Sequence, residues 1–173
     1  MRRPRIRSFP PIAGRNARVL VLGSMPGRAS LAAGRYYAHP HNAFWRIVCE
    51  LLGIEPGAPY AARVRALKAA RIALWDVLHS CVREGSLDAR IEEELANDFA
   101  AFFRRHRDVA KVFFNGAKAQ ASFMRHVAPG LGVTRLRYSR LPSTSPAHAG
   151  MTYARKRRAW RAVLRSAQRR GTE

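Results

Sequence analysis

The stretch Val19-Leu20-Val21-Leu22, followed at once by Gly23-Ser24-Met25-Pro26-Gly27, decides the fold of this 173-residue chain. A short apolar run that ends in glycine and proline is typical of a buried parallel strand leading into a loop. In open α/β sheets, the loops that follow the carboxyl ends of the strands hold the ligand. We therefore expect a strand at residues 18–23 and a functional loop directly after it.

Apolar runs of the same kind return at residues 72–78, 109–114 and 133–141. Helical spacing of apolar residues predicts helices at residues 43–53, 60–70, 91–107, 117–127 and 153–170. Strands that alternate with helices favour a parallel sheet covered on both faces. We predict an α/β fold, a three-layer α/β/α sandwich around a four-stranded, mainly parallel sheet, with residues 81–89 as a loop.

Length and composition favour a single domain over residues 1–173, with a basic N-terminal extension at 1–17 and a basic C-terminal helix at 153–170. No apolar run approaches the roughly 18 residues of a membrane span, and no apolar segment follows the basic N-terminus as in a secretory signal. Cys49 and Cys81 lie in apolar contexts without a CxxC partner. They predict buried free thiols in a reducing, cytoplasmic compartment, and neither metal nor cofactor.

The net charge of +21, carried mostly by arginine, points to a polyanionic partner such as nucleic acid. Residues 1–18 hold six arginines and no acid, and residues 151–173 hold eight basic residues against one acid. Eight of the 11 acids lie between Asp76 and Asp108. An arginine-rich proteome is the alternative explanation, but it accounts for arginine over lysine and not for the shortage of acids.

Three of the predicted strands end in polar loops, which a parallel sheet brings to one edge. These loops are Gly23–Gly27, Asn115-Gly116 and Leu141–Pro146, and Asp76 lies near the end of the remaining strand. This edge is therefore the predicted site.

Three motifs in order, at residues 23–27, 36–45 and 141–149, resemble the uracil-DNA glycosylase superfamily, and most of all its hypoxanthine-DNA (deoxyinosine) glycosylase branch. The His-Pro-x-Asn-x-Phe-Trp segment is also similar to the mismatch-specific uracil/thymine glycosylases. The resemblance covers nearly the whole chain. It implies a monofunctional base-excision repair enzyme that flips a deaminated base out of DNA, hydrolyses its N-glycosidic bond and leaves an abasic site. We expect DNA as the partner of a nucleoid-associated monomer.

Two departures from the uracil-specific members direct this expectation towards hypoxanthine. Met25 stands where the mismatch-specific branch has an asparagine that positions the attacking water. The hypoxanthine branch relies instead on the asparagine of its His-Pro-x-Asn segment, which is Asn42 here. Leu141 stands where uracil-specific members have a histidine that donates to the uracil oxygen. A uracil or mismatch glycosylase and a non-catalytic nucleic-acid-binding module on the same scaffold remain the alternatives.

Asn42 and His39 are the expected catalytic residues. The amide oxygen of Asn42 can orient a water while its NH₂ group contacts the base or the sugar. The alternative for Asn42 is a helix N-cap, because it directly precedes a predicted helix. His39 could act in proton transfer or contact a phosphate, and a structural loop histidine is the alternative.

The expected base-binding residues are Gly23, Ser24, Met25, Tyr37, Phe44, Asp76 and Asn115. Gly23 and Ser24 permit close approach of backbone N–H groups to a base oxygen or a phosphate. Either Tyr36 or Tyr37 would stack on the flipped base. Phe44 would help to wall the base, while the adjacent Trp45 belongs to the core.

Asp76 and Asn115 each have a second interpretation. Asp76 is either a base-reading acceptor or a buried carboxylate paired with an arginine. Asn115 either bonds the base edge or forms the turn before Gly116.

The expected DNA-binding residues are Ser143, Thr144, Ser145, His148, Arg155, Lys156 and Arg158. Hydroxyls and backbone N–H groups on a proline-bounded loop suit phosphate contacts, which the start of the last helix would extend. For that helix, a solvated face is the alternative. The apolar wedge position of the third motif falls near the small Ser145, so His148 or Met151 would fill the emptied base stack.

Overall fold

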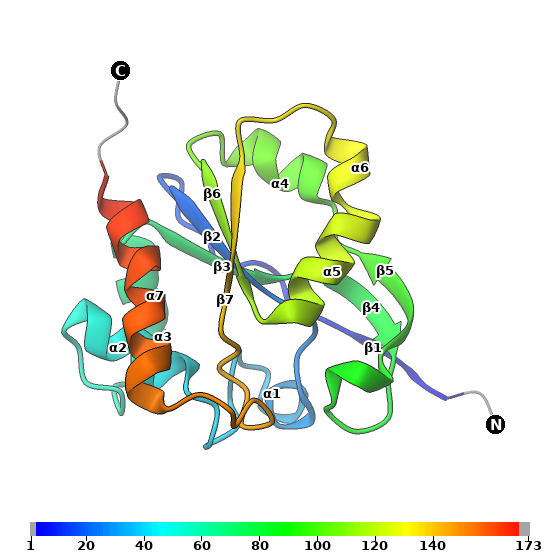
Figure 1. Cartoon of the computed structure of the whole chain (residues 1–173), viewed down its shortest axis with the longest axis horizontal. Helices are drawn as coiled ribbons and strands as arrows, with labels where there is room; N and C mark the ends of the chain where they lie inside the picture. The colour runs from blue at the N-terminus through cyan, green and yellow to red at the C-terminus, as the bar shows by residue number, and fades with distance from the viewer. Residues whose placement is uncertain (1–2, 170–173) are drawn as a thin grey trace.

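Four parallel strands form the centre of the structure, a computed structural model that describes residues 3–169 of the chain (Figure 1). The sheet order is β3-β2-β6-β7. The strands are β2 (Val19–Gly23), β3 (Ile72–Asp76), β6 (Lys111–Asn115) and β7 (Arg137–Leu141). Every residue of β2 and β3 is buried, which explains their unbroken apolar sequences.

The register of these strands aligns their carboxyl ends. Gly23 lies opposite Asp76, and Asn115 lies opposite Leu141. The strand-end loops at 23–27, 115–116 and 141–146 therefore leave the sheet at one edge, as the sequence predicted.

Helices cover both faces of this sheet, which confirms the expected three-layer α/β/α arrangement (Figure 1). One layer holds α2 (Phe44–Leu52), α3 (Tyr60–Ala69) and α7 (Tyr153–Gln168). The other holds α4 (Phe99–Arg105), α5 (Ala117–His126) and α6 (Ala128–Leu131). A short helix, α1 (Arg28–Ala33), follows the first motif. Position 170 of the predicted last helix lies outside the described residues.

A second, three-stranded antiparallel sheet was not expected from the sequence. Its order is β1-β4-β5, formed by β1 (Arg5–Arg7), β4 (Leu78–Val82) and β5 (Glu92–Ala96). Part of the predicted N-terminal extension is thus built into the fold, and Ile12 forms a further bridge with Leu74 of β3. Positions 1 and 2 lie outside the described residues.

Two predictions at residues 81–107 were wrong. The predicted loop at 81–89 begins later, because β4 continues through Val82, and it contains the short 3₁₀ helix η1 (Asp88–Arg90). The predicted helix at 91–107 is a strand followed by α4. Glutamates favour helices, but pairing with β4 and the Arg5–Glu93 ion pair (2.7 Å) place them in a strand.

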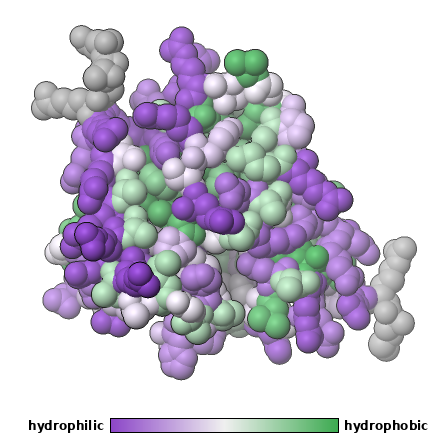
Figure 2. Space-filling view, in the orientation of Figure 1, coloured by the Kyte–Doolittle hydropathy of each residue, from purple (hydrophilic) through white to green (hydrophobic). Residues whose placement is uncertain are grey.

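The core is rich in aromatic side chains, among which Phe44, Phe99, Phe113, Phe114, Phe123 and Trp160 are fully buried. Cys49 and Cys81 are buried and free, as predicted. Within residues 3–169, no helix has the length and apolar character needed to cross a membrane. Figure 2 shows hydrophilic residues over much of one face, interrupted by smaller hydrophobic patches.

The start of α4 provides a test of this revised boundary. The side chain of Asp98 accepts a hydrogen bond from the Ala101 backbone N–H at 2.9 Å and caps the helix. We expect Asp98→Ala to lower the free energy of unfolding by about 1 kcal/mol in urea titrations. Asp108→Ala, on an exposed turn, is the matched control. Equal losses in the two variants would contradict the cap.

Candidate active site

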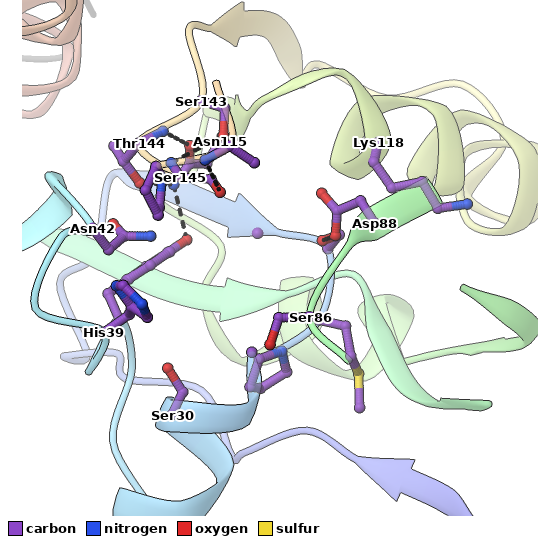
Figure 3. Close-up of a pocket in the computed structure, with 18 of the residues that line it drawn as sticks. Ser30, His39, Asn42, Ser86, Asp88, Asn115, Lys118, Ser143, Thr144 and Ser145 are labelled. Atoms are coloured by element: carbon purple, nitrogen blue, oxygen red, sulfur yellow. Dashed lines mark hydrogen bonds between the residues drawn. The ribbon is translucent and has the colours of Figure 1, made fainter. Parts of the chain in front are cut away.

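The carboxyl ends of the parallel strands open into a cavity of about 550 Å³ (Figure 3). Most of the predicted site residues line it: Gly23, Ser24, Met25, Tyr37, His39, Asn42, Asp76, Asn115, Ser143, Thr144, Ser145 and His148. Phe44, Arg155, Lys156 and Arg158 do not. The cavity is also lined by residues that the sequence analysis did not single out: Ser30, Ser86, Leu87, Asp88 and Lys118.

Asn115, which lines this cavity, connects the loop of Tyr37 with the loop of Thr144 (Figure 3). Its amide nitrogen donates to the Tyr37 hydroxyl at 3.1 Å and to Thr144 Oγ1 at 2.9 Å. Its amide oxygen accepts from the Thr144 backbone N–H at 2.9 Å. Because both amide hydrogens are committed, only the remaining lone pair of the oxygen is left for contact with a base. The geometry thus gives Asn115 a bracing role that neither sequence interpretation included.

Tyr37 forms the aromatic wall that the sequence analysis assigned to Phe44. The two rings are stacked, with centroids 4.1 Å apart, and Phe44 is fully buried behind Tyr37. Tyr36 belongs to the core, since its hydroxyl donates to the Pro10 carbonyl at 2.8 Å and its ring is almost fully buried. Trp45 is also in the core, as expected, and donates to the Tyr36 carbonyl at 2.7 Å.

Asp76 lies at the end of β3 and is only 3% exposed. It forms no ion pair with any described residue, and its buried Oδ2 has no hydrogen-bond partner. The expected arginine pairing is therefore absent from the described part of the chain. Burial, followed by the charge of Asp88, raises the pKa of Asp76 to about 7, against the opposing effect of Arg83. Near neutral pH this carboxyl can thus either donate or accept a hydrogen bond.

Gly23 makes the close approach of Asp76 and Tyr37 possible. A Cβ atom at position 23 would lie 2.5 Å from Asp76 Oδ1 and 2.8 Å from the Tyr37 hydroxyl oxygen. Any larger residue would force these polar groups apart. The first glycine of the motif is therefore required by packing against the two side chains.

Asp88 faces Asn42 and His39 across the cavity (Figure 3). Its Oδ1 accepts a hydrogen bond from Ser24 Oγ at 2.6 Å, which leaves Oδ2 for a ligand. Although the residue as a whole is exposed, loss of water around the carboxyl on the cavity side raises its pKa, while Ser24 and Arg83 oppose the rise. Asp88 was missed because residues 81–89 were predicted as a loop and no role was assigned to this acid, although an acid directly after Ser86-Leu87 was a usable signal.

Asn42 is not the N-cap of α2, because Ala43 occupies that position. Its Oδ1 instead accepts from the Phe44 backbone N–H at 3.0 Å, two residues along the chain. Neighbouring His39 accepts from the His41 backbone N–H at 3.1 Å through Nδ1. In the neutral ring the proton is therefore on Nε2, which makes that atom a donor.

The loop of the third motif is held by its own hydroxyls. Ser143 Oγ accepts from the Ser145 backbone N–H at 3.1 Å, and Ser145 Oγ accepts from Ala147 at 3.2 Å. Thr144 is buried against Asn115. Both serines keep their hydroxyl hydrogens for donation, as contacts with phosphate require.

The start of α7 differs from its predicted role. Lys156 is buried, and its ammonium donates to the His148 carbonyl at 2.6 Å, so it braces the third motif loop from inside. Arg155 and Arg158 are exposed on the helix. Met151, one of the two predicted wedge residues, does not line the cavity.

The described residues contain no group of three or more histidine, cysteine, aspartate or glutamate side chains placed to hold a metal ion. Lys118, one of the cationic residues that line the cavity, is paired with Glu94.

The model of the uracil DNA glycosylase superfamily matches residues 10–166, and the chain belongs to this family. A hypoxanthine DNA glycosylase of Methanosarcina acetivorans is 35% identical over 161 residues, which are 92% of this chain and 98% of that protein. A hypoxanthine DNA glycosylase of Methanosarcina barkeri is 38% identical over 112 residues, 64% of this chain and 71% of that protein. A solution NMR structure of a candidate uracil DNA glycosylase from Methanosarcina acetivorans has a TM-score of 0.81 and 32% identity, covering 96% of this chain and 100% of that one.

The raised pKa of Asp76 predicts a particular pH dependence of stability. Between pH 4 and 7 the native state keeps a proton on Asp76 that the unfolded state has lost, so the contribution of this group to wild-type stability falls as pH rises. Asp76→Asn removes this loss. The free energy of unfolding of the variant minus that of the wild type should therefore grow from pH 4 to 7, by at most about 1.4 kcal/mol per pH unit.

Urea titrations of both proteins at pH 4, 5, 6, 7 and 8 measure this difference, in which the other titrating groups cancel. A difference that stays constant over the whole range would contradict a proton-bearing Asp76.

Proposed function

We propose that the protein is a monofunctional DNA glycosylase that removes hypoxanthine from deoxyinosine-containing DNA and leaves an abasic site. The observation that carries this proposal is that Asn42 and His39 face Asp88 across one cavity (Figure 3), which Asp76 also lines. Similarity to two hypoxanthine DNA glycosylases supports it independently.

Hydrolysis requires a water to attack C1′ of the deoxyribose while the C1′–N9 bond breaks and the base leaves with the bonding electrons. We assign the orientation of this water to Asn42, whose amide oxygen has a lone pair beyond the one used by Phe44. His39 lies beside Asn42 at the cavity rim, where its Nε2–H can contact the neighbouring phosphate.

Hypoxanthine offers the cavity one donor, N1–H, and acceptors at O6 and N7. Oδ2 of Asp88 is a suitable acceptor for N1–H, because Oδ1 already holds Ser24. The protonated carboxyl of Asp76 is a suitable donor to O6 or N7, where negative charge develops as the base departs. The Tyr37 ring, supported by Phe44, supplies a stacking surface.

Uracil excision is less well supported by the residues. Leu141 is buried and carries no donor at the position where uracil-specific members have a histidine. The basic chain would act on DNA as a single-domain monomer of the cytoplasm, associated with the nucleoid and without a cofactor. A non-catalytic DNA-binding module is the remaining alternative, and it predicts an unaltered DNA product.

Product analysis tests the proposal directly. Purified protein is incubated with duplexes that contain one deoxyinosine, deoxyxanthosine or deoxyuridine, and alkali then converts abasic sites into strand breaks. We expect breaks at deoxyinosine. Breaks confined to deoxyuridine would replace the proposal by a uracil glycosylase, and intact DNA on every substrate would favour the binding module.

Asn42→Ala should separate catalysis from folding. We expect the single-turnover excision rate to fall by about 100-fold or more, the loss typical when a reacting group is no longer held in position. The lost hydrogen bond to Phe44 should cost only about 1 kcal/mol of stability. His41→Ala, an exposed neighbour outside the cavity, is the control and should retain the rate. An active Asn42→Ala variant would exclude the catalytic role.

Asp88→Asn tests recognition of the base. The asparagine of the variant keeps an oxygen that can accept from Ser24. Its NH₂ group, however, faces the N1–H of the base, so two hydrogen-bond donors are placed against each other. The excision rate on deoxyinosine should fall by about 10- to 100-fold, the loss expected for a hydrogen bond to a charged group. Glu84→Gln removes an acid from the same segment, outside the cavity, and serves as the matched control. Equal rates in the two variants would place the base elsewhere.

A further inference from the structure

Leu87 is a large apolar side chain left exposed at the cavity. It is 50% exposed and lines the cavity. Three other large hydrophobic side chains of the described residues are similarly exposed, Leu95, Met124 and Val133, and they lie elsewhere. Isolated exposed leucines are ordinary on protein surfaces. What distinguishes Leu87 is its position beside the site together with the way its segment is held.

The segment that carries Leu87 is anchored to the first motif on both sides. Ser86 Oγ accepts from the Arg28 backbone N–H at 2.9 Å, and the carboxyl of Asp88 accepts from Ser24 at 2.6 Å. The guanidinium of Arg83 donates to the carbonyls of Pro26 and Gly85. The Leu87 carbonyl accepts from Arg90 at 3.0 Å and closes a turn. An exposed leucine is therefore presented on a rigid support, directly between two residues that bond to the cavity-lining loop.

A base that leaves a duplex creates a gap in the stack, and flipping proteins oppose its return with an apolar side chain inserted between base steps. The third motif loop offers Ser145, Pro146, Ala147 and His148 at the cavity. The serine, the alanine and the histidine are small or polar, and the ring of Pro146 is smaller than a leucine side chain. Leu87 has the size and the apolar character that this task requires.

We propose that Leu87 is the wedge that enters the DNA stack when the damaged nucleotide occupies the cavity. This inference rests on the proposed function, and it moves the wedge from the third motif loop to the segment between β4 and η1.

Single-turnover excision from deoxyinosine in duplex and in single-stranded DNA tests the proposal, because only the duplex has a stack to fill. Leu87→Ala should slow excision from the duplex by about 10-fold or more, since unstacking costs a few kcal/mol, and leave the single-strand rate within about twofold of wild type. Leu87→Met keeps an apolar wedge and should restore the duplex rate. Leu95→Ala, from a residue that is 54% exposed and does not line the cavity, should leave both rates unchanged.

The ratio of the duplex rate to the single-strand rate distinguishes a wedge from a general defect, because a general defect would lower both excision rates equally. An unchanged ratio in Leu87→Ala, or a duplex-selective loss in His148→Ala instead, overturns the wedge while leaving the proposed function intact. A wild-type protein that excises hypoxanthine from neither substrate overturns the proposed function itself, and the wedge with it.

Discussion

The hydrogen bonds of Asn115 are the interaction on which the geometry of this site depends. One side chain at the end of β6 holds the Tyr37 loop and the Thr144 loop, which are separated from it by 78 and 29 positions in the chain. The parallel register places Asn115 beside Leu141, so the third motif begins within reach of its amide. Because Tyr37 is stacked on Phe44 at the start of α2, the same bonds also locate the loop that carries His39 and Asn42.

The pKa values of the acids at the site are opposite to what the positive charge of the whole molecule would favour. A net charge of +21 would be expected to keep every carboxylate ionised, yet loss of surrounding water raises the pKa values of Asp76 and Asp88. The surface charges have little effect on these carboxyls because most of them lie too far away. At physiological salt, exposed charges are screened over about 8 Å, whereas loss of water acts on the carboxyl itself. Arg83, the nearby cation, directs its bonds to backbone carbonyls and opposes the shift only in part. The surface can therefore attract a polyanion while the cavity holds a carboxyl that keeps its proton.

The local patterns predicted the central sheet well, because a buried parallel strand must be apolar on both faces and such runs are conspicuous. They failed at Glu92–Ala96, where three glutamates and an alanine favour a helix but pairing with β4 and the ion pair between Glu93 and Arg5 of β1 determine the outcome. The same failure hid Asp88. Its approach to Ser24 depends on where β4 ends and η1 begins, and no periodicity in the sequence reports that.

The sequence by itself determined the class of fold, the edge of the sheet that carries the site and the strand-end loops that meet there, because the apolar strand runs and the motifs that follow them are local properties of the chain. The tertiary structure decided what each side chain does. It placed Phe44 behind Tyr37, buried Lys156 beneath the third motif loop, left Asp76 without an ionic partner and brought Ser86, Leu87 and Asp88 to the cavity. These outcomes depend on burial and on contacts between distant segments, and both exist only once the chain has folded.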